Sequence, residues 1–182
     1  MASFNDQVER ETRKITFGDQ ADARRQYEAE HGNCRYTPEA IEAIASLSPL
    51  IEFRADRGHW QRALTAAGAT VVSYVPWSPP PHRSALPPEM ASAGKVFPGD
   101  ETAIRMHQDK TLLVVYPPPG DMALRCLQEY HGDALVYVGE GRGGVNSCDD
   151  FFDRLDAEWE VVTVLDLNPF PLCFERLFVL RR

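Results

Sequence analysis

The stretch Ile51–Trp60, IEFRADRGHW, is typical of a buried strand that turns directly into a helix. After the turn, apolar or part-apolar side chains recur at helical spacing at His59, Trp60, Ala63, Leu64 and Ala67. Open α/β proteins bind phosphates and nucleosides at such turns, usually with several glycines in the backbone. This turn contains a single glycine, Gly58. The stretch is therefore either a cofactor site or the remnant of one.

The composition favours a soluble protein that forms one domain with an acidic surface. The chain has 182 residues and a net charge of -8, which argues against general binding to nucleic acid or to an anionic membrane. No apolar run approaches the roughly 20 residues of a membrane span. Residues 1–18 show no clear period, so we expect a flexible N-terminal arm there and a single domain over residues 19–182.

The N-terminal residues and the cysteines both indicate a cytoplasmic protein. The first twenty residues mix acids with bases and lack the apolar centre of a signal peptide. The four cysteines lie far apart and form no C-x-x-C pair, which favours reduced thiols. The histidines share no metal-ligand spacing with the cysteines or with each other, so no metal site is predicted.

The first half of the chain alternates between helical and strand patterns. A charged helix over residues 19–31 is followed by a strong helix start at Thr37–Glu39, with a capping residue, a proline and an acid. The later elements are a strand over Leu50–Phe53, a helix over His59–Ala67 and a strand over Thr70–Val75. Residues 76–109 are proline-dense, and we expect a surface loop or a ligand-binding lid that includes a short edge strand at Lys95–Phe97.

The second half returns to regular alternation and closes with a hairpin. We expect strands over Thr111–Tyr116 and Ala134–Val138, with a helix between them. Ser147 and Asp150 form a capping box before a helix that contains Phe151 and Phe152. Strands over Glu160–Leu167 and Arg176–Leu180 are joined by a segment too short for a crossover helix, so they should pair antiparallel. The predicted fold is α/β: a three-layer Rossmann-like fold with a mostly parallel central sheet and a C-terminal antiparallel hairpin.

These patterns resemble one enzyme family. The segment from Tyr36 to Val75 resembles the opening of a class I S-adenosylmethionine-dependent methyltransferase, in which the first strand ends in E-x-G-x-G-x-G. Residues 152–182 are similar to that family's last helix and hairpin, and the resemblance extends from about Arg24 to the C-terminus. It implies S-adenosylmethionine as the cofactor. In the family, backbone at the glycine turn approaches the cofactor, and an acid ending the second strand accepts hydrogen bonds from its ribose.

Five positions of this chain align with the family's cofactor site. Glu52 and Gly58 are kept, whereas Arg54 and Asp56 stand where glycines are expected. The second strand ends in Val75 and Pro76 instead of an acid. Because glycine is used there for its open backbone angles and its lack of a side chain, we expect Arg54 to fill the cofactor's space. The sequence predicts a cofactor turn that has decayed.

Three residues are candidates for chemistry. Glu140 lies in GEGRGG, a glycine-rich turn after a strand that either binds an anion or simply connects strand to helix. Tyr116 precedes three prolines, where methyltransferases acting on amines often carry a polar residue followed by Pro-Pro and an aromatic, although prolines also simply end strands. His59 begins a helix and is either an acid/base group or a solvated helix start.

Two functions remain open from the sequence. One is a methyltransferase that uses S-adenosylmethionine on an unknown substrate. The other is a non-catalytic binding or protein-interaction module on a methyltransferase-like fold, with a small-molecule or protein partner that the sequence does not identify. Fold resemblance alone does not decide between them.

Overall fold

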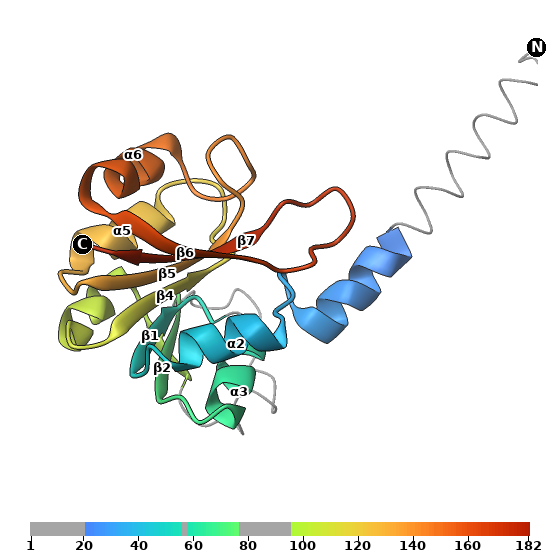
Figure 1. Cartoon of the computed structure of the whole chain (residues 1–182), viewed down its shortest axis with the longest axis horizontal. Helices are drawn as coiled ribbons and strands as arrows, with labels where there is room; N and C mark the ends of the chain where they lie inside the picture. Colours follow the sequence, from blue (N-terminus) through green and yellow to red (C-terminus); the bar gives the residue numbers. More distant parts are fainter. Residues whose placement is uncertain (1–20, 56–57, 77–95) are drawn as a thin grey trace, which may run out of the picture.

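Apolar runs in the sequence form the centre of a seven-stranded sheet in the order β3-β2-β1-β4-β5-β7-β6. The computed structural model describes residues 21–55, 58–76 and 96–182 (Figure 1). The strands are β1 Leu50–Phe53, β2 Val71–Pro76, β3 Val96–Gly99, β4 Thr111–Val115, β5 Ala134–Gly139, β6 Glu160–Asp166 and β7 Arg176–Arg181. The helices are α2 Pro38–Ala45, α3 His59–Ala66, α5 Met122–Glu129 and α6 Asp149–Glu158, with a 3-10 helix η1 at Glu101–His107. Residues 21–31 are also helical.

The strand directions match the predicted fold. Strands β3, β2, β1, β4 and β5 are parallel neighbours, and β7 lies antiparallel between β5 and β6. All residues of β1 and β5 are buried, as expected for strands covered on both faces. The predicted mostly parallel sheet with a C-terminal antiparallel hairpin is confirmed.

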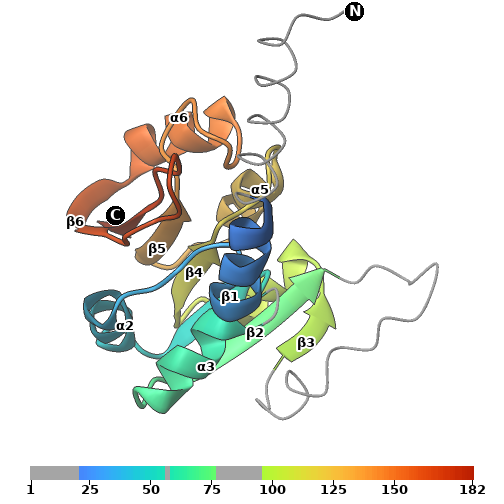
Figure 2. The same ribbon diagram turned by 90° about the vertical axis from the view of Figure 1, so that its right-hand side faces the viewer.

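Two apolar cores lie on opposite faces of the sheet and make three layers. One core joins Phe53 and Val114 to α5, α6 and η1. The other joins Leu50 and Leu113 to α2 and α3. Figure 2 shows the two helical layers on either side of the strands. Within the three described ranges, no helix has the length and apolar composition needed to cross a membrane.

Of the two helix caps predicted from the sequence, the one at Thr37 is confirmed and the one at Ser147 is not. Thr37 caps α2 as predicted, since its Oγ1 accepts a hydrogen bond from the Ala40 amide at 3.2 Å. The capping box at Ser147 was wrong. Cys148 is the N-cap of α6 and makes no side-chain capping bond, while Ser147 has a left-handed φ of 62°. The Ser147 hydroxyl has no hydrogen-bond partner among the described residues, so it does not cap the helix.

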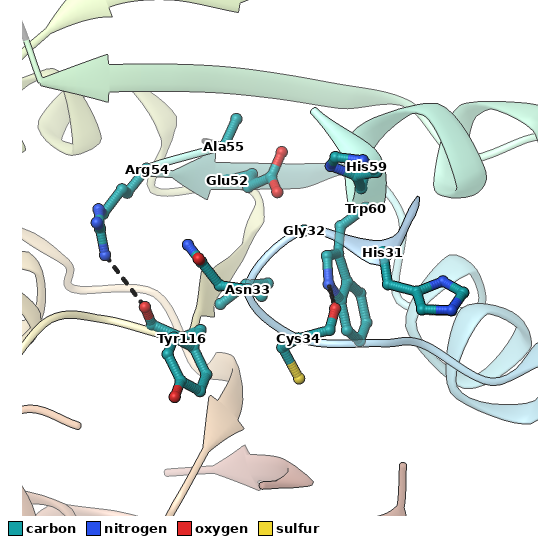
Figure 3. Close-up of a pocket in the computed structure, with 11 residues that line it drawn as sticks. His31, Gly32, Asn33, Cys34, Glu52, Arg54, Ala55, His59, Trp60 and Tyr116 are labelled. Atoms are coloured by element: carbon teal, nitrogen blue, oxygen red, sulfur yellow. Dashed lines mark hydrogen bonds between the residues drawn. The ribbon is translucent and has the colours of Figure 1, made fainter. Parts of the chain in front are cut away.

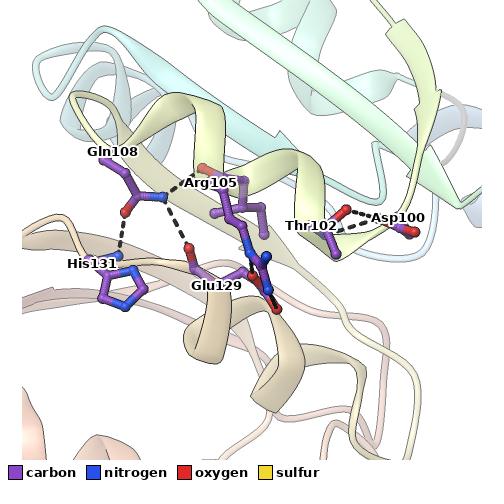
Figure 4. A network of polar contacts seen from close by, with 7 residues as sticks. Asp100, Thr102, Arg105, Gln108, Glu129 and His131 are labelled. Carbon is purple, nitrogen blue, oxygen red and sulfur yellow. Dashed lines mark hydrogen bonds and ion pairs between the residues drawn. The ribbon is translucent and has the colours of Figure 1, made fainter.

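The helix η1 was not predicted, because its surroundings appeared to be irregular loop. Asp100 begins it by accepting a hydrogen bond from the Thr102 amide. Gln108 follows η1 and ties it to the end of α5 (Figure 4). Its Nε2 donates to the carbonyls of Ile104 at 2.8 Å and Glu129 at 3.0 Å, and its Oε1 accepts from the His131 amide.

Three elements of the sequence analysis lie outside the described residues. They are the arm over residues 1–18, Asp56 and nearly all of the proline-rich segment 76–94. The division into an arm and a single domain stays a prediction.

Replacing Gln108 tests the junction between η1 and α5. Gln108→Ala removes three hydrogen bonds and should lower the free energy of unfolding by about 2 kcal/mol. Urea unfolding measures the change. Met106→Ala, at a side chain that is 69% exposed in η1, is the control and should change stability by less than about 0.5 kcal/mol. Equal losses in both variants would contradict the structural role of Gln108.

Candidate functional site

The chain leaves β1 and β4 in opposite directions along the sheet, and a crevice lies beyond the carboxyl ends of these two strands. Open α/β sheets bind ligands at this switch point. The side chains there come from β1, β4, α3 and the segment after the first helix (Figure 3). The lining residues are His31, Gly32, Asn33, Cys34, Glu52, Arg54, Ala55, His59, Trp60, Val115 and Tyr116.

Arg54 spans the crevice from one strand to the other. Its Nη1 donates a hydrogen bond of 3.2 Å to the Tyr116 carbonyl at the end of β4 (Figure 3). Its backbone has a φ of 65°, in the left-handed region that favours glycine. Arg54 thus has the backbone conformation that glycine favours, with a long side chain placed across the crevice.

Glu52 lies in the wall of the crevice and is only 1% exposed. Its Oε2 accepts a hydrogen bond of 2.7 Å from the hydroxyl of Ser73 on β2. The Glu52 carboxylate is therefore hydrogen-bonded to the neighbouring strand β2.

The segment between the first helix and α2 closes another side of the crevice. The Trp60 indole donates a hydrogen bond of 3.0 Å to the Cys34 carbonyl. Gly32 has a φ of 74°, and a Cβ there would lie 3.0 Å from Nδ1 of His59, so glycine permits this close approach. The remaining cavity has a volume of about 20 Å³, on the order of one water molecule.

The structure brings Glu52, Arg54, His59 and Tyr116 together at the crevice. Gly58 stands beside them as the N-cap of α3, with a left-handed φ of 72°. Val75 does not line the crevice, because it lies partly buried near the end of β2, opposite Pro98 of β3.

Glu140 is also absent from the crevice. Its carboxylate accepts backbone hydrogen bonds from Val145 at 3.0 Å and Phe174 at 3.1 Å, and the residue is 8% exposed. A Cβ on Gly144 would lie 2.5 Å from the Glu140 side chain. The glycine at this point of GEGRGG therefore makes room for Glu140, which fastens two loops together.

Comparisons with solved structures identify the fold. The chain aligns with Streptococcus pneumoniae Sp1610, a proposed tRNA (m1A22) methyltransferase in complex with S-adenosyl-L-methionine, at 15% identity and a TM-score of 0.54 over 79% of this chain and 72% of that one. It aligns with the glycopeptide N-methyltransferase MtfA, also complexed with S-adenosyl-L-methionine, at 10% identity and a TM-score of 0.51 over 83% and 96%. A Streptococcus agalactiae protein of the NADB-Rossmann superfamily gives 13% identity and a TM-score of 0.54 over 84% and 71%. No protein-family model and no curated protein matches the chain.

The chain has a class I methyltransferase-like fold. At these identities the similarity concerns the fold alone. Whether this methyltransferase-like domain accommodates S-adenosylmethionine has to be judged from its own crevice.

The residues of the crevice do not fit the cofactor. Pockets that bury drug-sized ligands have volumes of about 300–1,000 Å³, whereas the cavity between β1 and β4 holds about 20 Å³. Arg54 crosses the crevice to the Tyr116 carbonyl, and the side chain of Val75, at the position of the family's ribose-binding acid, has no hydrogen-bond acceptor. Within the described residues there is likewise no cluster of three His, Cys, Asp or Glu side chains able to hold a metal ion.

Glu175, just before β7, is a buried acid that the sequence analysis missed. It is 1% exposed, and neither carboxyl oxygen has a hydrogen-bond partner among the described residues. Burial raises the pKa of this carboxyl and the charge of Glu140 adds to the rise, while the residue's own backbone amide and Arg24 partly oppose it. Burial, followed by the charge of Glu175, also raises the pKa of the Tyr116 hydroxyl. No local pattern marks Glu175 in the sequence, because its burial depends on distant segments.

The first helix approaches the same end of the sheet (Figure 2). Arg24 Nη1 donates to Sγ of Cys173 at 3.4 Å, and the rings of Tyr27 and Phe170 have centroids 5.4 Å apart. The helix over residues 21–31 is therefore held against the loop between β6 and β7.

Exchanging glycine and alanine at position 54 tests the backbone strain. Arg54→Gly and Arg54→Ala both remove the guanidinium, but only glycine adopts a φ of 65° without strain. The glycine variant should be more stable by about 1 kcal/mol in urea unfolding. At the neighbouring Ala55, which has no positive φ, Ala55→Gly should instead destabilise by about 0.5–1 kcal/mol. The same sign at both positions would contradict the left-handed conformation of Arg54.

Removing the Glu175 charge tests its raised pKa. Because the folded state binds the proton more tightly, wild-type stability should fall as the pH rises from the ordinary value of 4.5 through the raised pKa. Glu175→Gln should therefore gain stability relative to wild type as the pH rises, with the difference vanishing below pH 4.5. Urea unfolding at several pH values measures this. Glu160→Gln, on the exposed strand β6, is the control, and an equal pH-dependent gain there would refute the assignment.

Proposed function

We propose that this methyltransferase-like domain does not bind S-adenosylmethionine and acts as a non-catalytic binding or interaction module. The observation that carries the proposal is the bridge from Arg54 to the Tyr116 carbonyl, which leaves about 20 Å³ in the crevice. To enter the crevice, S-adenosylmethionine would have to break the hydrogen bond between the charged Arg54 side chain and the Tyr116 carbonyl, inside a partly buried site. Hydrogen bonds to charged groups contribute about 1.5–3 kcal/mol each.

Two departures from the family's cofactor pattern lie on different parts of the fold. This supports loss of the cofactor more than it supports a single local substitution. Arg54 lies on the turn after β1, whereas Val75 lies on β2. The fold requires neither change, because β1 and β2 pair in regular parallel register. Loss of a single ligand would account for both departures.

The positions of the candidate catalytic residues support the same proposal. Glu140, the preferred acid/base group from the sequence, binds two backbone amides and is not at the crevice. Tyr116 contributes its carbonyl to the Arg54 bridge, and its ring stands at the crevice without a polar group of the amide or carboxylate type. The alternative, an active methyltransferase, requires Arg54 to leave the crevice.

We further propose a cytoplasmic location and a small-molecule or protein partner. All four cysteines are free thiols, in keeping with a reducing compartment. The net charge of -8 disfavours general nucleic-acid binding.

Calorimetry on the full chain tests the loss of cofactor binding. The wild type should give no heat of binding with S-adenosylmethionine or S-adenosylhomocysteine at about 1 mM, where a site of about -4 kcal/mol would be half filled. Submillimolar binding by the wild type would overturn the proposal and restore the methyltransferase alternative.

A triple variant tests whether the three departures cause the loss. Arg54→Gly with Asp56→Gly should open the turn, and Val75→Asp should supply a ribose acceptor, so the triple variant should gain measurable affinity. The matched control replaces Arg54→Gly by Arg54→Lys and keeps a long side chain in the crevice, so it should stay silent. A well-folded triple variant without affinity would count against a former cofactor site, and equal binding by the control would refute the role of Arg54.

A further inference from the structure

A second cavity lies between α6 and the β5-β7-β6 end of the sheet. Its volume is about 160 Å³. The lining residues are Tyr137, Gly141, Phe152, Leu155, Asp156, Trp159, Val161, Phe178 and Leu180. None of them lines the crevice beyond β1 and β4. Figure 1 shows α6 above this end of the sheet, so the cavity is a separate site in the layer that contains α5 and α6.

The cavity exists because the helical layer ends before the sheet does. α6 buries Phe151, Phe152 and Leu155. The last strand, β6, extends beyond this cover, and its Val161 and Val164 are 50% and 41% exposed. The open space is thus bounded by α6 on one side and by apolar strand residues on the other.

The size and walls of the cavity suit one aromatic ring. An apolar cavity of about 150 Å³ in another protein binds benzene. Here the Tyr137 ring forms one wall, with its centroid 6.0 Å from that of Phe152 in an edge-to-face arrangement and 5.9 Å from that of Phe178. Aromatic walls favour a planar ring and also attract cations.

The rim of the cavity is acidic. α6 carries five acids and a single base within Asp149–Glu158. Asp156 lines the cavity, and its carboxylate lies 2.9 Å from Nη2 of Arg142. The Arg142 guanidinium in turn lies 5.7 Å from the centroid of the Phe152 ring. The rim therefore already holds one cation between a carboxylate and an aromatic ring.

A ligand cation does not have to displace Arg142. Nη2 of Arg142 also lies 2.8 Å from Asp153, so that guanidinium keeps a carboxylate when Asp156 pairs with a ligand. Among the described residues that line the cavity, only Asp156 carries a charge, which makes it the charged anchor of the site.

We propose that this cavity binds a small organic cation with one aromatic ring and an ammonium group on a short linker. The ring occupies the cavity that Tyr137, Phe152 and Phe178 help to line, and the ammonium pairs with Asp156 at the rim. The site does not depend on the state of the crevice between β1 and β4.

Three ligands with the same ring and different charges test the proposal on the full chain. Benzylamine is a cation at pH 7, benzyl alcohol is neutral and benzoate is an anion. In amide NMR titrations to about 10 mM, ten times the half-filling concentration of a millimolar site, benzylamine should bind at least about fivefold more tightly than benzoate, as expected for an exposed ion pair. Benzyl alcohol should be intermediate. The shifts should concentrate on α6, β7 and the Trp159 indole.

Two valines of β6 provide a matched pair of variants. Val161→Phe should fill the cavity and weaken benzylamine binding at least tenfold. Val162→Phe places the same ring on the same strand at a residue that is 51% exposed and does not line the cavity, so binding should be unchanged. Aromatic residues are favoured in strands, so both variants should fold.

Asp156→Asn, at an exposed side chain, tests the charge separately from the shape. It should equalise benzylamine and benzyl alcohol while leaving the benzyl alcohol affinity unchanged. No titration shift in the wild type, benzoate binding as tight as benzylamine, or equal weakening by the two phenylalanine variants would each overturn the proposal. Retained selectivity for benzylamine in Asp156→Asn would overturn the role of Asp156.

Discussion

The hydrogen bond from Arg54 to the Tyr116 carbonyl joins the two strand ends between which a Rossmann-like sheet normally admits its ligand. Both residues have positive φ angles, 65° and 45°, at the ends of adjacent parallel strands. Such conformations cost about 1–3 kcal/mol in residues with side chains and persist only where the surroundings enforce them. Parallel pairing on both sides of β1 is the constraint that holds this turn in place. Arg54 therefore has a backbone conformation that favours glycine, although it carries a long side chain.

The three buried acids near the carboxyl ends of β1 and β5 differ in what their carboxyl groups contact. Glu52 accepts from the Ser73 hydroxyl, and Glu140 accepts from two backbone amides. These bonds make both acids part of the scaffold, although their sequence positions are those of functional groups. Glu175 has no such bonds, and its raised pKa follows from burial beside Glu140. Position at the end of a strand therefore does not show whether a carboxyl group is structural. The hydrogen bonds that the carboxyl group accepts are the better guide.

Sequence patterns predicted the sheet because burial on both faces leaves a continuous apolar run, as in β1 and β5. The antiparallel hairpin followed from the short connection between β6 and β7. Local patterns failed where distant contacts decide. The helix η1 depends on Gln108 binding the end of α5, and the start of α6 depends on the left-handed turn at Ser147. At the candidate site the departure at Arg54 was visible in the sequence, but the removal of Glu140 from the crevice depends on Val145 and Phe174, which the motif does not include.

The two cavities contrast in how the helices cover the sheet. At the crevice, the segment containing Gly32 and Cys34 packs against α3 and leaves space on the order of one water molecule. At the other end, α6 stops short of β6 and leaves an aromatic cavity with an acidic rim. Hydrophobic burial would favour closing this second cavity, since exposed apolar surface costs about 25 cal/mol per Å². The larger of these two spaces therefore lies on the α6 side of the sheet, away from the crevice beyond β1 and β4.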